Sequence, residues 1–394
     1  MSSPNVLDVS SFSKELNFML LLLRTDRQLT TEEAIEQSRE MDWKQFLAFV
    51  RYHHVFPTIQ QVLARLNKDK QWVPSFVMMK LNSYFTSNTF EMLHLRGELE
   101  RVNSALIEKG IRALMLKGPV LADHLYGDVS GRTSKDLDIL VPKDDVERTE
   151  KLLIDLGYQL SEEAPELLNN TERKTHHLSY FHYDKGVEVE LHWSLNPDTV
   201  KEPSFDELWG NRQASSLNQE VYTLGDEDLY VYLVLHGARH AWSCLRWVLD
   251  MDRLLTKELN WHKLTDMFRT YKVIHLGGQA AVLTSHLFGT RLPKAAKQMT
   301  LNSRSYRLAQ QTLPFMREQV ILYPKPERKD IAIYFNKYLL STMTLRQKRL
   351  YVLNKLYPSS WDALLLPLPK ALHFLYFPLR PFLWFWRQVK RQST

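Results

Sequence analysis

The amino-acid sequence predicts an α+β protein in which a small core with strands lies between two largely helical regions. Helical spacing of apolar residues dominates before residue 109 and after residue 226, whereas short apolar runs alternate with helices between them. Only 13 of the 394 residues are glycine, which argues against a glycine-rich dinucleotide fold. We predict a helical region over 1–109, an α/β core over 110–225, a helical region over 226–355 and an aromatic, proline-rich, basic tail over 356–394.

The composition is that of a folded soluble protein, with 44% apolar and 24% charged residues. The single cysteine, Cys244, excludes a disulfide framework and a multi-cysteine zinc site. With no signal-peptide pattern at the N-terminus, a reducing cytoplasm is the expected location. The net charge of +6 favours anionic partners such as nucleotides or phospholipid headgroups. Nucleic acid is disfavoured because no RNA-binding signature with interleaved aromatics is present.

A helical stripe ends the N-terminal region, with apolar residues at Leu95, Leu99, Val102 and Leu106 and Gly110 at the expected C-cap. The apolar run 111–116 then predicts a strand, and Pro119 is suited to the first turn of a helix. Between them, Lys117 and Gly118 form a turn where backbone can approach a phosphate closely and a lysine adds positive charge. An ordinary turn is the alternative interpretation.

The rest of the chain is organised around Asp136 and Asp138, which are followed by apolar residues up to Val141. On a strand both carboxylates project from one face and repel each other. A divalent cation, usually Mg²⁺ in contact with substrate phosphates, would relieve this repulsion. Arg132 and Lys135, in the loop before the strand, could bind an anionic substrate or remain solvated loop charges.

Two further strands, 176–183 and 187–193, are predicted to form a hairpin around the turn Asp184-Lys185-Gly186. The second strand alternates apolar residues with Glu188, Glu190 and His192. If this polar face borders that of the aspartates, one glutamate completes a carboxylate trio. An exposed hairpin face with ordinary surface acids is the alternative.

From Asp226 onward the pattern predicts one long helix. One side of that helix carries His236, Arg239, His240, Ser243, Arg246, Trp247, Asp250 and Arg253. This polar arc could bind a nucleobase or phosphate, or it could be a surface face in which Arg246 pairs with Asp250. His236 and His240 have the spacing of a metal pair, but no glutamate stands between them as in zinc hydrolases.

The tail over 361–391 is crowded with Leu, Phe and Trp but is interrupted by prolines and basic residues. It therefore contains no clean 20-residue apolar helix, which argues against a transmembrane span. The segment could lie at a membrane interface, or it could pack on the protein's own helices or on a partner.

Four motifs, in a fixed order along the chain, resemble those of a known protein family. They are Leu116-Lys117-Gly118, R-x-x-x-D-L-D-I-L-V from Arg132, V-E-L-H-W from Val189, and H-G-A-R-H-x-W-x-x-L-R-W-x-x-D from His236. From about Trp43 to Leu255 the chain resembles the uncharacterised nucleotidyltransferase family, a branch of the DNA polymerase β-like nucleotidyltransferase superfamily. The resemblance implies a small mixed sheet with flanking helices, a nucleoside triphosphate and two divalent ions.

In this resemblance the catalytic metal ligands are Asp136, Asp138 and Glu190, with Glu188 as the fallback for the third acid. Lys117-Gly118 occupies the position where the superfamily has Gly-Ser beside the triphosphate. Two departures stand out. Gly118 is followed by proline and lies farther from Asp136 than is usual, and the third acid is a glutamate.

The predicted function is the Mg²⁺-dependent transfer of a nucleoside monophosphate to an acceptor hydroxyl, with release of pyrophosphate. The expected substrate- or phosphate-binding residues are Lys117, Gly118, Arg132, Lys135, His192, His236, His240 and Arg246. The acceptor is open among a sugar, lipid, peptide or protein. Alternatives are a non-catalytic nucleotide-binding protein and a membrane-surface assembly factor that acts through the tail. In that last case the protein would be cytoplasmic and bound peripherally to the inner face of the membrane.

Overall fold

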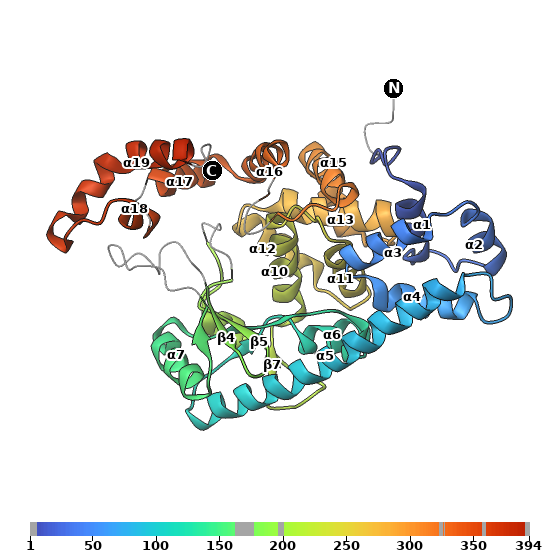
Figure 1. Cartoon of the computed structure of the whole chain (residues 1–394), viewed down its shortest axis with the longest axis horizontal. Coiled ribbons are helices and arrows are strands. Elements are labelled where there is room, and N and C mark those ends of the chain that lie inside the picture. Colours follow the sequence, from blue (N-terminus) through green and yellow to red (C-terminus); the bar gives the residue numbers. More distant parts are fainter. Residues whose placement is uncertain are drawn as a thin grey trace.

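The computed structural model describes residues 6–161, 177–195, 201–322, 326, 328–356 and 360–390. It contains one mixed sheet among many helices, so the predicted α+β class is confirmed (Figure 1). His176, the predicted start of a strand, and Arg391 in the predicted tail lie outside the described residues.

The N-terminal helices are α1 (Lys14–Leu22), α2 (Thr31–Gln37), α3 (Trp43–Tyr52), α4 (Phe56–Leu66) and α5 (Ser75–Glu108). The long helix α5 ends as predicted, because Gly110 takes a left-handed conformation with φ 64°. The N–H of Ile111 then donates to the carbonyl of Leu106 at 2.9 Å, which satisfies a carbonyl in the last turn.

The sheet has the strand order β3-β4-β5-β2-β1-β7-β6. Its strands are β1 (Leu114–Met115), β2 (Asp136–Leu140), β3 (Gln159–Leu160), β4 (His177–His182), β5 (Val187–His192), β6 (Gln213–Ala214) and β7 (Tyr222–Thr223). The strand β2 pairs in parallel with β5 and antiparallel with β1. The hairpin of β4 and β5 forms as predicted. The two-residue strands β3, β6 and β7 are too short to leave a periodic pattern in the sequence.

Three short helices accompany the strands: α6 (Pro119–Tyr126), α7 (Val146–Asp155) and α9 (Phe205–Gly210). Pro119 is at the first position of α6, as predicted. Asp145 is the N-cap residue of α7, but its side chain makes no hydrogen bond to the helix backbone. Its carboxylate accepts a hydrogen bond from Arg148 instead, at 2.5 Å, and a short 3₁₀ turn (Lys143–Asp145) precedes the helix.

The two faces of the sheet have different neighbours. One face buries apolar side chains such as Leu137, Ile139 and Val189 against Leu99 and Val102 of α5, in a cluster that also includes α7. The other face carries the acidic residues and is turned toward the helices that follow residue 226. In Figure 1, α5 runs along one side of the sheet and α10 stands on the other. The sheet is therefore a layer between two helical layers, with its polar face inside the molecule.

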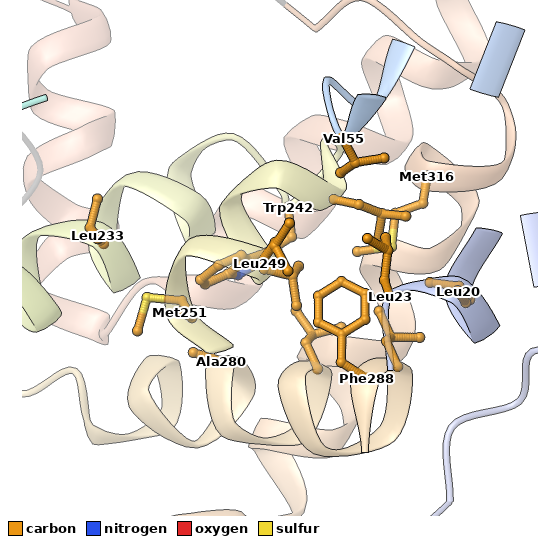
Figure 2. Packing of buried hydrophobic residues seen from close by; sticks show 14 of the residues in the cluster. Leu20, Leu23, Val55, Leu233, Trp242, Leu249, Met251, Ala280, Phe288 and Met316 are labelled. Atoms are coloured by element: carbon orange, nitrogen blue, oxygen red, sulfur yellow. The ribbon is translucent and has the colours of Figure 1, made fainter. Parts of the chain in front are cut away.

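The helices after residue 226 are α10 (Asp226–Arg239), α11 (Leu245–Leu254), α12 (Trp261–Thr270), α13 (Ile274–Phe288), α14 (Lys294–Thr300), α15 (Ser303–Arg317) and α16 (Lys329–Thr342). They share one buried cluster with the N-terminal helices. Figure 2 shows Leu23 and Val55 packed near Trp242, Phe288 and Met316. This common core holds the helices that stand over the sheet in a fixed position.

The single long helix predicted from Asp226 is wrong, because the chain turns between α10 and α11. Ala241 and Trp242 take left-handed conformations, with φ 51° and 49°. The Trp242 ring is fully buried against Gly237, where an added Cβ would lie 2.5 Å from it. Burial of this large ring offsets the cost of two strained residues.

After α16 the chain forms α17 (Leu345–Leu356), and the C-terminal tail then forms α18 (Ser360–Leu365), a 3₁₀ segment (Lys370–Leu375) and α19 (Tyr376–Lys390). Tyr376 and Leu383 form the centre of a small apolar cluster of their own. In Figure 1 these helices lie beyond α16, at the end of the molecule away from α1 to α4. Among the described helices, none has the length and apolar character needed to cross a membrane.

Candidate functional site

The parallel pairing of β2 with β5 brings four acids onto one face of the sheet. Asp136 is the register partner of Glu188, and Asp138 is the partner of Glu190. Paired residues in neighbouring strands project to the same side. The polar face of the hairpin and the face of the aspartates are therefore a single face. Asp138 is buried, and Asp136 and Glu190 are partly exposed, so the alternative of a simple exposed hairpin face does not hold.

Lys117 reaches this face from the turn before α6. Gly118 has φ 76° and ψ −147°, a conformation open mainly to glycine, and a Cβ there would lie 3.4 Å from the carbonyl oxygen of Asp136. The turn directs Lys117 Nζ to 2.8 Å from Asp138 Oδ1. Burial alone would raise the pKa of Asp138, but the Lys117 charge and a hydrogen bond from His192 hold it below its usual value.

His192 connects two of the acids. Its Nε2 lies 3.3 Å from Asp138 Oδ1 and 3.2 Å from Glu190 Oε2. Burial would lower the pKa of His192, yet the hydrogen bonds to these carboxylates raise it. Burial likewise favours neutral Glu190, but the hydrogen bond from His192 lowers its pKa, so Glu190 is charged near neutral pH. Asp136 differs, because burial and the nearby charge of Asp138 raise its pKa.

A cavity of about 370 Å³ opens between the acidic face and the helices α10 and α11. Its lining residues are Lys117, Arg132, Ser134, Asp136, His177, Glu190, His192, Leu195, Tyr232, His236, Arg239, His240, Arg246 and Trp247. The volume lies within the range of sites for small ligands. Glu190 lines the cavity whereas Glu188 is not among its lining residues, which favours Glu190 over the fallback for the third acid.

The wall opposite the acids is aromatic. The rings of His236 and His240 lie 4.5 Å apart, and the Trp247 ring lies 5.6 Å from His236 and 5.0 Å from His240. Burial lowers the pKa of His240 to about 3 and that of His236 well below its usual value. Both imidazoles are therefore neutral at physiological pH. They offer flat surfaces and hydrogen-bonding nitrogens rather than positive charge.

Arg132 binds another side chain of the protein, Asp250 of α11. Its guanidinium is buried and binds Asp250 through Nε and Nη2, each 3.0 Å from a carboxylate oxygen, and Tyr126 donates to the same carboxylate at 2.9 Å. The predicted alternative pairing of Arg246 with Asp250 is therefore wrong, since Asp250 is buried and binds Arg132. Lys135 is exposed and does not line the cavity.

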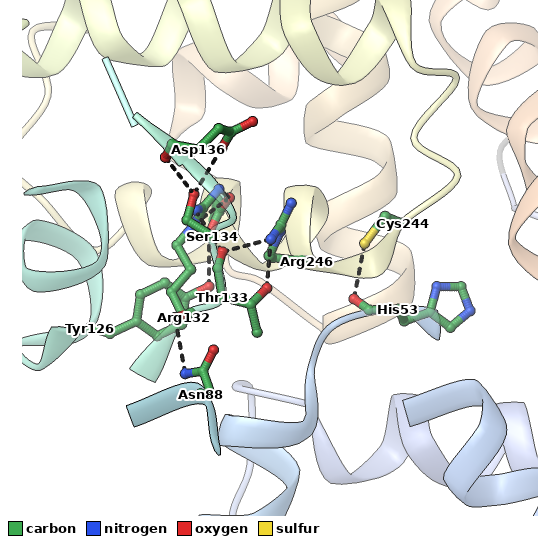
Figure 3. Close-up of polar contacts among 10 residues, drawn as sticks. His53, Asn88, Tyr126, Arg132, Thr133, Ser134, Asp136, Cys244 and Arg246 are labelled. Atoms are coloured by element: carbon green, nitrogen blue, oxygen red, sulfur yellow. Dashed lines mark hydrogen bonds and ion pairs between the residues drawn. The ribbon is translucent and has the colours of Figure 1, made fainter. Parts of the chain in front are cut away.

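Arg246 holds the same loop from the other side. Its Nη1 donates to the carbonyl and to the hydroxyl of Thr133, each at 2.6 Å. Figure 3 shows this contact together with the Ser134 hydroxyl, which donates to Asp136 Oδ1 at 3.2 Å. Two arginines on either side thus fix the loop that leads into β2.

His177 and Tyr232 line the cavity but were not predicted as site residues. His177 is the register partner of His192, and its Nε2 lies 4.0 Å from Glu190 Oε1. The alternation in the predicted hairpin could have placed His177 on the acidic face once the hairpin register was known. Tyr232 lies one turn before His236 on α10, where it resembles an ordinary core aromatic in the sequence.

The residues of this face fit a divalent cation. Asp138 Oδ2 is buried and, within the described part of the chain, has no hydrogen-bond donor. A buried carboxylate oxygen that accepts no hydrogen bond is stabilised by a bound cation. Glu190 and two imidazoles, His177 and His192, also place donor atoms within 4.8 Å of one another. Carboxylates and imidazoles together are the common ligands of divalent metals in proteins.

A mixed sheet with two aspartates on one strand and a third acid on its parallel neighbour, next to a cavity of this size, is typical of nucleotidyltransferases. The sequence comparison agrees with the geometry. Residues 39–289, more than half of the chain, match the family described as uncharacterised nucleotidyltransferase, and the protein belongs to this family. The predicted membership is confirmed. A search among curated proteins found no significant match.

Proposed function

We propose that the protein transfers a nucleoside monophosphate from a nucleoside triphosphate to an acceptor hydroxyl and releases pyrophosphate, in a metal-dependent reaction. The observation that carries this proposal is the shared face of Asp136, Asp138 and Glu190 beside a cavity with cationic and aromatic walls. Asp136, Asp138 and Glu190 would hold two Mg²⁺ ions. When bound, these ions neutralise phosphate charge and make the acceptor hydroxyl more acidic.

The protein's own groups would bind the triphosphate at the end of the cavity near α6. Gly118 lets the backbone approach a phosphate closely, and the first turn of α6 presents free amides. Lys117 is mostly buried beside Asp138, where its charge would offset the charge that develops on the phosphates. Because Glu190 is charged near neutral pH, it can act as a metal ligand or accept the proton of the acceptor hydroxyl.

The nucleobase would lie against the opposite wall. Neutral imidazoles and an indole suit an uncharged aromatic ring better than a phosphate, since they stack and exchange hydrogen bonds without added charge. His236, His240 and Trp247 are therefore the proposed base-binding residues. Arg239 and Arg246 line the same cavity and would bind phosphate or acceptor oxygens. His192 would orient Asp138 and Glu190 and not contact the base.

The test is to incubate the protein with Mg²⁺, cell extract and each nucleoside triphosphate, labelled in turn at the α- and the γ-phosphate. We expect label to reach an acceptor from the α-position only, because the nucleotidyl group is transferred and pyrophosphate leaves. The variant Asp136→Asn should reduce transfer at least ~100-fold, as expected for loss of a metal ligand in a two-metal site. Asp144→Asn, an exposed acid just beyond the same strand, is the control and should retain activity.

Transfer from the γ-position, or undiminished transfer by Asp136→Asn, would contradict the proposal. Binding of a triphosphate without transfer to any acceptor would favour the second candidate, a non-catalytic nucleotide-binding protein. Three acids share one face of the sheet, and two of them, Asp136 and Glu190, line the cavity. This arrangement favours the enzyme, because binding alone does not require a third carboxylate next to the phosphates.

We also propose that the protein is cytoplasmic and that its C-terminal segment, residues 328–394, attaches it peripherally to an anionic membrane. Residues 328–394 contain twelve Lys and Arg but two acids, whereas residues 1–327 contain 39 basic and 43 acidic residues. Both acids of this C-terminal segment, Asp330 and Asp362, already bind arginines. Exposed aromatic side chains lie in the same segment, at Phe374, Phe377, Phe382 and Trp386. Exposed aromatics beside excess cations fit a headgroup interface.

This attachment predicts co-sedimentation of the full-length protein with vesicles that contain phosphatidylserine, and little with vesicles of phosphatidylcholine alone. The double change Phe382→Ser and Trp386→Ser should weaken sedimentation, because both side chains are exposed and contribute apolar area. Replacement of Leu301, an exposed leucine outside the tail, by Ser is the control. Absence of the full-length protein from the anionic vesicle pellet would contradict the attachment.

A further inference from the structure

The edge of the acidic face nearest β4 carries two imidazoles. We propose that His177, Glu190 and His192 form a metal position with mixed nitrogen and oxygen ligands, and that this position prefers Mn²⁺ or Zn²⁺ to Mg²⁺. The inference deepens the proposed function, on which it rests for the role of Glu190, and it assigns a different ion to one part of the site.

Strand pairing places these three side chains together. In the antiparallel hairpin His177 is the direct partner of His192, and Glu190 is the partner of Ser179 two pairs further along. Residues that alternate along β5 share a face, so both imidazoles project to the side that bears Asp138. The imidazole rings have their centres 4.9 Å apart. The backbone of two adjacent strands, rather than a loop, therefore sets the separation of the ligands.

The distances need only small movements to close around an ion. Glu190 Oε2 lies 3.2 Å from His192 Nε2, and Glu190 Oε1 lies 4.0 Å from His177 Nε2. All three donor atoms lie within 4.8 Å of one another. Ligands around a tetrahedral ion with bonds of about 2.0–2.1 Å are separated by about 3.4 Å. His177 is partly exposed, so its side chain is the one that would move to reach that separation.

The chemistry of the ligands selects the ion. Mg²⁺ is a hard cation that takes oxygen ligands in near-octahedral geometry, so two imidazoles are poor partners for it. Zn²⁺ and Mn²⁺ accept imidazole with carboxylate, and three protein ligands leave positions open for water or substrate. Glu190, His177 and His192 all line the cavity, so the open positions would face the substrate space. Asp136 and Asp138 supply oxygen alone and keep the position suited to Mg²⁺.

The opposing interpretation is that the imidazoles only orient Glu190 by hydrogen bonds. The two interpretations differ in whether a nitrogen atom is bonded to a bound ion. Pulsed electron paramagnetic resonance detects this bond directly, because an imidazole nitrogen bonded to Mn²⁺ modulates the electron spin echo.

The experiment uses the full-length protein with Mn²⁺ alone, without nucleotide. We expect nitrogen modulation from imidazole in the wild-type protein, persistence of this signal in a 100-fold excess of Mg²⁺, and its loss on addition of Zn²⁺. His177→Ala should weaken Mn²⁺ binding at least ~10-fold and reduce the modulation. His182→Gln is the matched control, because His182 lies on the same strand but on the opposite face. Asp136→Asn should retain the modulation.

Bound Mn²⁺ without nitrogen modulation, or no binding of Mn²⁺ to the wild-type protein, would overturn the inference. The wild-type spectrum decides this even if His177→Ala fails to fold. The outcome is also separate from that of the labelled-nucleotide assay. Transfer with Mg²⁺ but without nitrogen modulation sinks the mixed-ligand position alone, whereas nitrogen modulation without any transfer leaves that position and sinks the proposed reaction.

Discussion

Lys117 Nζ lies 2.8 Å from Asp138 Oδ1, and the two side chains are 13% and 0% exposed. This ammonium is thus an internal cation next to the carboxylate at the centre of the acidic face. A carboxylate buried to this degree requires a compensating charge, because the cost of removing it from water is several kcal/mol. The stability of the strand that carries Asp136 and Asp138 is therefore tied to Lys117.

We predict that Lys117→Met destabilises the protein by about 3–5 kcal/mol, since removal of one partner leaves a buried charge uncompensated. Mg²⁺ or Mn²⁺ should restore part of this loss, because a divalent ion can take over the neutralisation of Asp138. Thermal unfolding with and without each ion measures both effects. Lys135→Met, a change at an exposed lysine in the loop before β2, should have little effect. A Lys117→Met variant as stable as the wild type would refute the assignment of Lys117 as the compensating charge.

Arg132 and Asp250 join the loop before β2 to α11 through a buried pair of hydrogen bonds. We predict that Arg132→Met costs about 3–5 kcal/mol of unfolding free energy, again because a buried carboxylate loses its partner. The double variant Arg132→Met with Asp250→Leu should recover much of that loss, since neither charge remains. Urea unfolding of the wild type, Arg132→Met, Asp250→Leu and the double variant forms a closed double-mutant cycle. Additive costs in this cycle would show that the pair is not coupled.

Local patterns predicted the acidic face well. Alternation in Asp136–Leu140 and in Val187–His192 depends only on neighbours two residues apart, and the turn at Gly186 fixes the hairpin. Contacts between distant segments were not predictable in this way. The pair of Arg132 with Asp250 spans 118 residues, so the loop position of Arg132 alone predicts phosphate binding and does not reveal this pair.

The sequence pattern does not reveal the break after α10, for a related reason. Apolar spacing continues through Ala241 and Leu245 as though the helix were unbroken, because both helices bury a face in the same core. The turn depends on where the Trp242 ring fits, next to Gly237, and this space exists only in the assembled structure. The sequence alone does not identify His177 as a site residue, because its place on the acidic face follows from the hairpin register and not from the residues next to it in the sequence.

Gly118 sets the direction of Lys117, and this gives a third prediction. Gly118 has φ 76° and ψ −147°, which are unfavourable for other residues. An alanine at position 118 should therefore cost about 1–3 kcal/mol of unfolding free energy. It should also weaken triphosphate binding, because the backbone must move away from Asp136. Urea unfolding and calorimetric titration with a non-hydrolysable triphosphate measure these effects. Gly97→Ala in α5, where added atoms meet open space, is the control and should stabilise the helix slightly. Unchanged stability of Gly118→Ala would contradict the strain at this turn.

His53 provides a prediction about pH. Its ring is completely buried, and Nδ1 accepts a hydrogen bond from the backbone N–H of Leu245 at 3.2 Å. Burial lowers the pKa of His53 to about 3, whereas an imidazole in the unfolded chain titrates near 6.5. Between these values the unfolded state binds a proton that the folded state does not bind. The contribution of His53 is therefore fully present above pH 6.5 and is lost as the pH falls toward 3.

We predict that His53→Gln lowers the unfolding free energy at pH 7.5 but flattens its dependence on pH. Between about pH 6 and 4 the slope should fall by up to about 1.4 kcal/mol per pH unit, the value for one proton. Urea unfolding at half-unit steps of pH measures the two curves. His262→Gln changes a histidine whose side chain is 92% exposed, and its curve should follow that of the wild type. Parallel curves for the wild type and His53→Gln would show that His53 is not the buried neutral imidazole that the structure indicates.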